Sequence, residues 1–307
     1  MVDWLLDPWQ LVFMRRAFAV AIMASIVCAV VGTFVVLRGM AFIGDAVAHA
    51  VFPGVAVGYA LGVNMALGGA VAGVTTALTI ALVSQNRRLK EDAVIGVFFA
   101  AAFGLGIVLI STQSSYTGDL ASFLFGQILA LNDTDVVTVA VLGAVLVAAI
   151  LALRKELVTV SLDRETAAAT GMRVFALDIG LYLMVTLAIV ISLQAVGNIL
   201  VLALLITPAA AARMLTDRLG TMMLVAATMG AVGAVIGLYL SFYFNLASGG
   251  LIVLVLTGAF VLCWVFGPRH GLIVKARQRH RPVPTGGTDS TDTSDPTGTP
   301  AAAAATP

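Results

Sequence analysis

Nine apolar windows, each near the length that a helix needs to cross a lipid bilayer, run through residues 17–266. A spanning helix takes about 20 mostly apolar residues. A soluble core could not hide this much apolar surface, because 60% of the residues are hydrophobic and 11% are charged, against about 45–50% and about 25% in soluble domains. The sequence therefore predicts an all-α, polytopic membrane protein with eight or nine transmembrane helices. The windows are Ala17–Leu37, Asp45–Leu61, Met65–Ser84, Ala93–Thr112, Thr134–Leu153, Phe175–Leu193, Val196–Met214, Leu219–Phe244 and Leu251–Phe266.

The positively charged residues predict the orientation, because Lys and Arg are retained on the cytoplasmic side of a bacterial plasma membrane. With nine spans and a cytoplasmic C-terminus, only Arg15 and Arg16 fall outside. These two arginines leave open an eight-span alternative with the N-terminus inside. The positive residues placed inside are Arg38, Arg87, Arg88, Lys90, Arg154, Lys155, Arg164, Arg173, Arg213, Arg218 and the basic run Arg269–Arg281, and the acidic residues placed outside are Asp3, Asp7, Asp119, Asp133 and Asp135.

The segments outside the windows divide the chain into three parts. Residues 1–16 are rich in Trp and Leu and have no signal-peptide cleavage pattern, so we expect an interfacial helix on the membrane lipid. Residues 17–267 form the predicted transmembrane permease domain. Residues 268–307 begin basic and continue in Pro, Thr, Gly, Asp, Ser and Ala, which predicts a disordered cytoplasmic tail.

Three smaller features limit the function. The piece Leu120–Leu131 is too short to span and predicts a re-entrant or interfacial segment. Cys28 and Cys263 lie in apolar runs, where a thiol behaves as a small apolar group. The formal net charge is +1, which gives no electrostatic basis for binding nucleic acid.

Asp45 and His49 lie four residues apart in the second window. An ionisable side chain within a membrane is costly unless it is paired or faces water, so both are functional candidates. A continuous helix from Arg38, rising about 1.5 Å per residue, would place them roughly 10–17 Å deep. Their spacing puts both on one helical face, and oxygen plus nitrogen ligation suits Mn²⁺, Fe²⁺ or Zn²⁺ better than Cu⁺. The alternative is a structural Asp–His ion pair between helices.

Two ligands do not complete a transition-metal site, which usually takes four. A second copy of the chain across a two-fold axis would supply two more. The stripe Gly54, Gly58 and Gly62 predicts close helix packing, and Pro53 could bend the helix near the pair.

A polar interruption, Arg154–Val174, predicts a short cytoplasmic helix. Asp163 can cap it, Glu165 lies in its first turn and Gly171 can end it. An ordinary solvated connector is the alternative. The small side chains that could enter a groove on a partner are Ala167, Ala168 and Ala169.

Polar residues in the later windows are weaker candidates. Asn198 could line a pathway or hydrogen-bond a neighbouring helix. Pro208 could kink its helix for gating or only for packing. Asp178, about one turn after Arg173, is interpreted as a local structural ion pair.

Together these stretches resemble the metal-ion permease family of ABC transporters, the membrane subunits of bacterial zinc, manganese and iron importers. The pieces that match are LRGMAFIGDAVAHAVFPGVAVGY, FGQILAL, SLDRETAAATGM and VGNILVLALLITPAAAARML. The resemblance implies that Asp45 and His49 meet the metal and that the segment Asp163–Gly171, with Glu165 and Ala168, docks on a cytosolic ATPase. It also implies a homodimer with an ATPase dimer and an extracytoplasmic metal-binding protein.

No G-x-x-x-x-G-K-[ST] phosphate loop occurs in the chain, so we expect ATP to bind a separate subunit and this chain to be no enzyme and to carry no intrinsic cofactor. A gradient-driven secondary cation transporter is the nearest rival, although it would need no docking helix. An intramembrane protease is a weaker rival, because aspartyl chemistry needs two carboxylates that share a site and no H-E-x-x-H motif is present.

Overall fold

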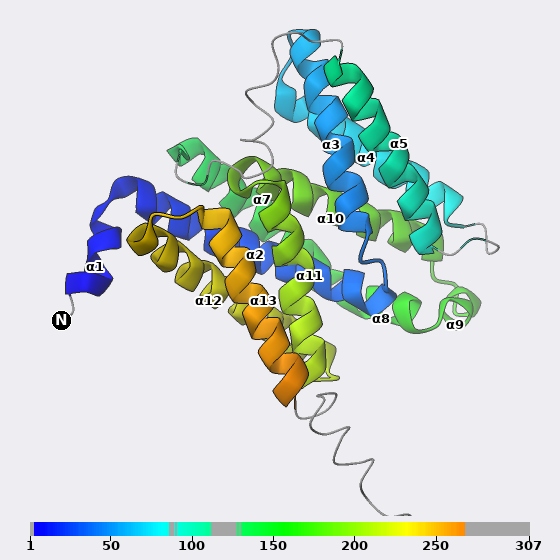
Figure 1. The fold of residues 1–307 in the computed structure, drawn as a ribbon. Helices are drawn as coiled ribbons and strands as arrows, with labels where there is room; N and C mark the ends of the chain where they lie inside the picture. The colour runs from blue at the N-terminus through cyan, green and yellow to red at the C-terminus, as the bar shows by residue number, and fades with distance from the viewer. Residues whose placement is uncertain (1–2, 86–88, 90, 112–127, 129, 268–307) are drawn as a thin grey trace, which may run out of the picture.

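The computed structural model describes residues 3–85, 89, 91–111, 128 and 130–267, and the described part is a bundle of helices (Figure 1). The predicted tail, residues 268–307, and most of the predicted re-entrant piece lie outside the described residues. The helices are α1 (Asp3–Gln10), α2 (Val12–Arg38), α3 (Ile43–Ala60), α4 (Met65–Val83), α5 (Glu91–Ser111), α7 (Asp133–Ala152), α8 (Arg154–Leu162), α9 (Arg164–Ala169), α10 (Val174–Val196), α11 (Asn198–Leu215), α12 (Leu219–Phe244) and α13 (Ser248–Phe266).

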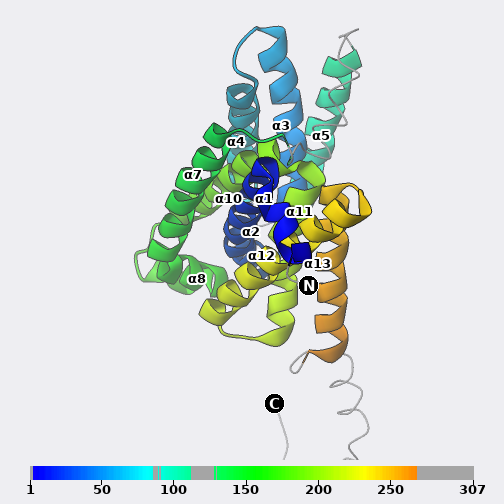
Figure 2. The same ribbon diagram turned by 90° about the vertical axis from the view of Figure 1, so that its left-hand side faces the viewer.

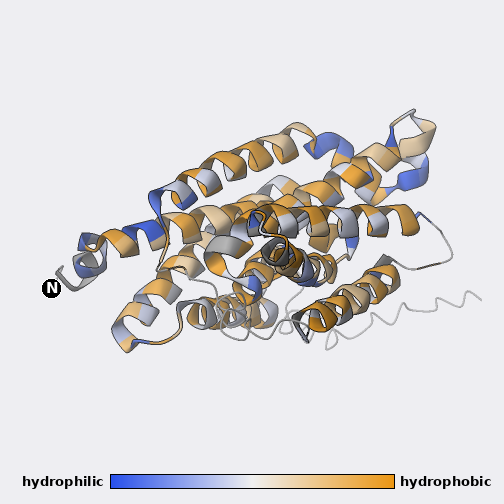
Figure 3. Ribbon diagram, turned by 90° about the horizontal axis from the view of Figure 1, so that it is seen from above, coloured by the Kyte–Doolittle hydropathy of each residue, from blue (hydrophilic) through white to orange (hydrophobic). Residues whose placement is uncertain are grey.

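The membrane prediction is confirmed. Each of the nine apolar windows overlaps a helix, and seven helices of the described part are long and apolar enough to cross a membrane. The two exceptions, α3 and α4, are apolar but shorter. Apolar residues run along the helices and polar residues gather at helix ends (Figure 3), as expected of a multi-pass membrane protein.

Helix α2 is the central element, and α7, α10, α11 and α12 pack around it (Figure 2). Most of its spanning segment is buried. Gly32 lets α2 approach α11 closely, since a Cβ at this position would collide with the backbone carbonyl of Leu205. The chain thus needs glycine where these two backbones meet.

Helices α3, α4 and α5 form a group of their own beside this centre (Figure 1). Gly54 on α3 faces Gly68 on α4, and a Cβ on Gly54 would lie 2.5 Å from the Cβ of Ala72. The predicted packing role of the glycine stripe is confirmed at Gly54 and Gly58, whereas Gly62 lies in the following turn with φ +67°.

At the end of the bundle that carries α1, Arg16 pairs with Asp133 through two contacts, from Nε to Oδ1 at 2.7 Å and from Nη2 to Oδ2 at 2.8 Å. One of the two arginines that favoured an eight-span count is therefore paired with an aspartate placed on the same side. Trp9 of α1 donates from Nε1 to the Tyr239 hydroxyl at 2.6 Å. The N-terminal helix ends at Gln10, so residues 12–16 belong to α2 rather than to the predicted N-terminal unit 1–16.

The opposite end of the bundle carries α8 and α9. The polar interruption forms two short helices, which meet at Asp163, rather than the single one predicted. Helix α8 packs on α2, α7 and α10, and α9 packs on α8 and α10.

Candidate metal pathway and docking helix

The corner between α2 and α3 sets the position of the predicted metal residues. Gly39 adopts φ +72°, its N–H bonds the carbonyl of Val36, and the N–H of Met40 bonds the carbonyl of Val35, which is a Schellman motif. The chain then turns, so Asp45 lies in the first turn of α3. The expected depth of roughly 10–17 Å is therefore wrong as counted, because it assumed one continuous helix from Arg38.

His49 presents one ring nitrogen for a ligand. Its Nδ1 lies 2.9 Å from the backbone carbonyl oxygen of Asp45, and a carbonyl can only accept, so Nδ1 carries the proton. In the neutral tautomer with this Nδ1 proton the lone pair lies on Nε2, the usual arrangement for a histidine that binds a metal through one nitrogen. Phe99 and Phe103 of α5 lie edge-on to the ring at centroid distances of 4.9 and 5.3 Å and support it on one side.

Asp45 is half-buried, and in the part of the chain that the structure describes its carboxylate forms no ion pair or hydrogen bond. The structure thus brings Asp45 and His49 together without the predicted alternative, a structural Asp–His ion pair. No cluster of three or more His, Cys, Asp or Glu residues occurs among the described residues. One copy offers two candidate ligands, fewer than a transition metal usually takes.

An open apolar cleft of about 730 Å³ begins one residue beyond His49 and lies between α3, α4 and α5. Pro53 and Gly54 line it, and α3 continues through Pro53 without a break in the helix. Thr75, Thr76 and Thr79 of α4 supply its hydroxyl groups. The cleft therefore leaves part of the α3 surface accessible, starting next to the candidate ligands.

Helix α9 has the cap that the sequence predicted. The Asp163 carboxylate accepts from the backbone N–H groups of Glu165 at 2.9 Å and Thr166 at 3.1 Å, and from the Thr166 hydroxyl. The bonds from Thr166, with that from Glu165, hold the pKa of the Asp163 carboxyl below its usual value because they favour the charged form. Gly171, at φ +81°, follows the end of the helix.

The small side chains of α9 face two directions. Ala167 is fully buried against its own chain, whereas Ala168 and Ala169 are exposed. The expectation that all three present one small surface to a partner is therefore wrong for Ala167. Leu162, just before the cap, is 75% exposed and is an apolar surface side chain that the sequence pattern did not single out.

The later candidates lie in the centre of the bundle. Asn198 is the first residue of α11 and is buried, and its Oδ1 accepts no hydrogen bond among the described residues. Pro208 is buried within α11, which remains helical through it. Neither residue is brought to Asp45 or His49 by any contact described above.

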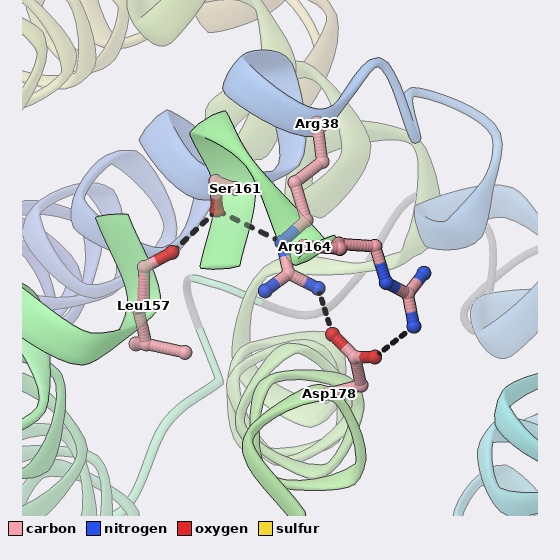
Figure 4. A network of polar contacts seen from close by, with 5 residues as sticks. All are labelled: Arg38, Leu157, Ser161, Arg164 and Asp178. Atoms are coloured by element: carbon pink, nitrogen blue, oxygen red, sulfur yellow. Dashed lines mark hydrogen bonds and ion pairs between the residues drawn. The ribbon is translucent and has the colours of Figure 1, made fainter. Parts of the chain in front are cut away.

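Asp178 is paired, but with other partners than expected. Its Oδ1 lies 2.6 Å from Nη1 of Arg38, and its Oδ2 pairs with Arg164, the first residue of α9 (Figure 4). The sequence could not reveal these pairs, because Arg38 is 140 residues away and the nearest cation in sequence, Arg173, is exposed.

The comparisons with known proteins agree with this architecture. The model of the ABC 3 transport family matches residues 10–267. The manganese transport system membrane protein MntC of Listeria monocytogenes is 43% identical over 269 residues, which cover 88% of this chain and 96% of that protein. The chelated iron transport system membrane protein YfeC of Yersinia pestis is 36% identical over an alignment that covers 92% of this chain and 98% of that protein.

A solved structure, PsaBC from Streptococcus pneumoniae in complex with Fab, contains a chain that is 37% identical to this one, with a TM-score of 0.79. The alignment covers 90% of this chain and all of that one. The predicted family is confirmed over residues 10–267. The chain is a multi-pass membrane protein that belongs to the ABC 3 transport family.

Proposed function

We propose that the chain is the membrane permease subunit of an ATP-driven importer of divalent transition-metal ions. The observation that carries this proposal is the arrangement on α3, where the Asp45 carboxylate has no partner among the described residues and the Nδ1 of His49 faces a backbone carbonyl. A membrane protein keeps an unpaired carboxylate in a span only where it meets an ion, a proton or water.

We favour manganese or iron as the transported ion. The similar proteins include a manganese transport system membrane protein and a chelated iron transport system membrane protein. Carboxylate and imidazole ligands suit Mn²⁺ and Fe²⁺, and they also accept Zn²⁺. The ion is cargo, and the chain carries no cofactor of its own.

A second copy of the chain would complete the site. One copy contributes two ligands, and the cleft beside them opens between α3 and α5 rather than closing over the pair. Two copies related by a two-fold axis would place two Asp and two His around one pathway, as a site of at least four ligands requires.

The ATPase would bind at the end of the bundle that carries α9. There Asp163 caps a short helix on which Glu165, Ala168 and Ala169 are exposed, and Gly171 ends it. This end also carries Arg154, Lys155 and Arg218, which border one groove, and by the positive-inside rule these charges support a cytoplasmic location for it. The tail after α13 would lie on the same side, and an extracytoplasmic metal-binding protein would deliver the ion at the α1 end.

Transport would proceed by alternating access around the α3 residues, with ATP hydrolysed on the partner subunit. Pro53 and Pro208 are the positions where a helix could bend, and Asn198 could contribute an oxygen along the route. An interfacial role for α1 and the residues that follow it on membrane lipid belongs to the same proposal, supported by the exposed Trp9, Leu11 and Phe13.

The test uses sealed vesicles with the chain alone, with the chain plus its ATPase, and with an ATPase that binds but does not hydrolyse ATP. A manganese-binding protein is added outside. We expect uptake of radiolabelled Mn²⁺ only when ATP is hydrolysed. Uptake by the chain alone under an imposed proton or ion gradient would identify it as a secondary transporter instead.

A further inference from the structure

The carboxylate of Asp178 joins three elements that are far apart in the sequence. It lies in α10 and accepts from Arg38 at the end of α2 and from Arg164 at the start of α9, one arginine on each oxygen (Figure 4). The side chains of Arg38 and Asp178 are each 7% exposed, and that of Arg164 is 43% exposed. A buried bridge of this kind is hard to break, because removal of one partner leaves an unpaired charge.

Arg38 is held in place by a fourth element. Its Nε donates to the Ser161 hydroxyl at 2.9 Å, and that hydroxyl donates to the carbonyl of Leu157 at 2.6 Å, both on α8. The two arginines and one aspartate carry a net charge of +1, so the carboxylate neutralises only one of two cations that would otherwise repel each other. Asp178 is therefore the residue on which the arrangement depends.

The same network is joined through the α2–α3 turn to the residues proposed to meet the metal. Arg38 ends α2, and the Schellman motif at Gly39 and the buried side chains of Met40 and Ile43 fix the turn that leads into α3. Asp45 follows in the first turn of α3. A displacement of Arg38 would therefore be passed to the start of α3 rather than absorbed in a loose loop.

The other side of the network is the proposed docking helix. Arg164 is the first residue of α9, which has only six residues and buries Ala167 against the bundle. A push on α9 would thus move Arg164, and through Asp178 it would move Arg38 and α10. Energetic coupling between distant sites needs such a chain of physical contacts together with evidence that both sites bias it.

We propose that Asp178 is the positioning residue that couples the docking helix α9 to the metal-bearing helix α3, through its two ion pairs with Arg164 and Arg38. This inference rests on the proposed function and deepens it, because it names the residue through which ATPase movement reaches the pathway. Asp178 itself contacts neither metal nor ATPase.

The experiment measures the number of Mn²⁺ ions imported per ATP hydrolysed, in vesicles that contain the full complex of permease, ATPase and binding protein. The variants are Asp178→Asn and Arg164→Gln, which remove the charge on one side of the bridge, and Arg164→Lys, which keeps it. Arg173→Gln is the matched control, since it removes an exposed charge at the start of the same helix, α10. The amount of ATPase retained by each purified complex reports assembly.

We expect Asp178→Asn and Arg164→Gln to lower the number of ions imported per ATP by about fivefold or more, with normal ATPase retention and continued hydrolysis. Arg164→Lys should recover most of the ratio, and Arg173→Gln should match the wild type. Arg164→Gln keeps the proposal testable if Asp178→Asn does not assemble, because Arg164 is partly exposed. An unchanged ratio in assembled Arg164→Gln and Asp178→Asn complexes would overturn the proposal. Absence of ATP-driven uptake in the wild type would instead refute the proposed function.

Discussion

Asp45 in α3 and Asp178 in α10 are two aspartates in apolar helices, and they differ in their partners. Asp178 is buried and pairs with two arginines, whereas the half-buried Asp45 forms no ion pair within the described residues. In a membrane protein, the partners of a paired charge offset the free-energy cost of burying it. An unpaired charge keeps that free-energy cost until it meets an ion, a proton or water. The contrast supports a structural role for Asp178 and the proposed metal-binding role for Asp45.

The first prediction tests the proposed role of Asp45 and His49 in metal transport. Asp45→Ala and His49→Ala should each reduce ATP-driven Mn²⁺ uptake by about 100-fold or more, since even residues that only support a metal ligand cost about 10–100-fold. Uptake of radiolabelled Mn²⁺ into vesicles measures this. Asp92→Ala, an exposed carboxylate at the start of α5, is the control and should transport normally. Uptake near the wild-type level in both α3 variants would remove these residues from the pathway.

The second prediction tests the contribution of Asp178 to the stability of the fold. Asp178→Ala should lower the free energy of unfolding by about 3–5 kcal/mol, because it leaves Arg38 buried without its partner. Thermal unfolding in detergent measures the change. Asp45→Ala is the matched variant and should leave stability nearly unchanged, as no partner is orphaned. Equal stability of the two variants would contradict the contrast between the aspartates.

The third prediction concerns the close packing of α3 against α4, which depends on glycine rather than on ion pairs. Gly54→Ala should destabilise the protein by about 1–3 kcal/mol, because the new methyl group overpacks the contact with α4. Thermal unfolding and Mn²⁺ uptake should fall together. Gly96→Ala in α5, where a Cβ meets nothing within 4 Å, should be neutral or slightly stabilising. A neutral Gly54→Ala would mean that α3 and α4 are less closely packed than described.

The smallest effect concerns the cap of α9. Because hydrogen bonds lower the pKa of Asp163 in the folded protein, its stabilising contribution is present above the pKa of the unfolded chain and is lost as the pH falls through the folded value. Asp163→Ala should therefore weaken ATPase binding at neutral pH, and Asp163→Asn, which can still accept at an N-cap, should weaken it less. Binding measured between pH 7 and acid pH should decline for the wild type and stay flat for Asp163→Ala. A wild type without this decline would show that the cap does not support docking.

The sequence predicted the helical class, the windows and the pair on α3, because apolar windows and isolated polar residues are local signals. It also predicted the Asp163 cap, which depends on two neighbouring residues, Glu165 and Thr166. The predicted windows left a break between Leu37 and Asp45, but the depth of Asp45 was misjudged because it was counted as if one helix ran through the turn at Gly39–Phe42. The sequence also missed the partners of Asp178, since an ion pair that spans 140 residues leaves no local pattern. Ala167 was misjudged because a run of three alanines does not show which one faces the bundle.

The most direct test of the central claim is pulsed electron paramagnetic resonance of Mn²⁺ bound to the purified permease, which detects nitrogen coordinated to the ion. The wild type should bind Mn²⁺ and show nitrogen coupling. His49→Ala should lose that coupling, Asp45→Ala should lose binding, and Arg173→Gln should behave as the wild type. Mn²⁺ bound with unchanged affinity and unchanged nitrogen coupling in both α3 variants would contradict the assignment of Asp45 and His49 to the metal pathway.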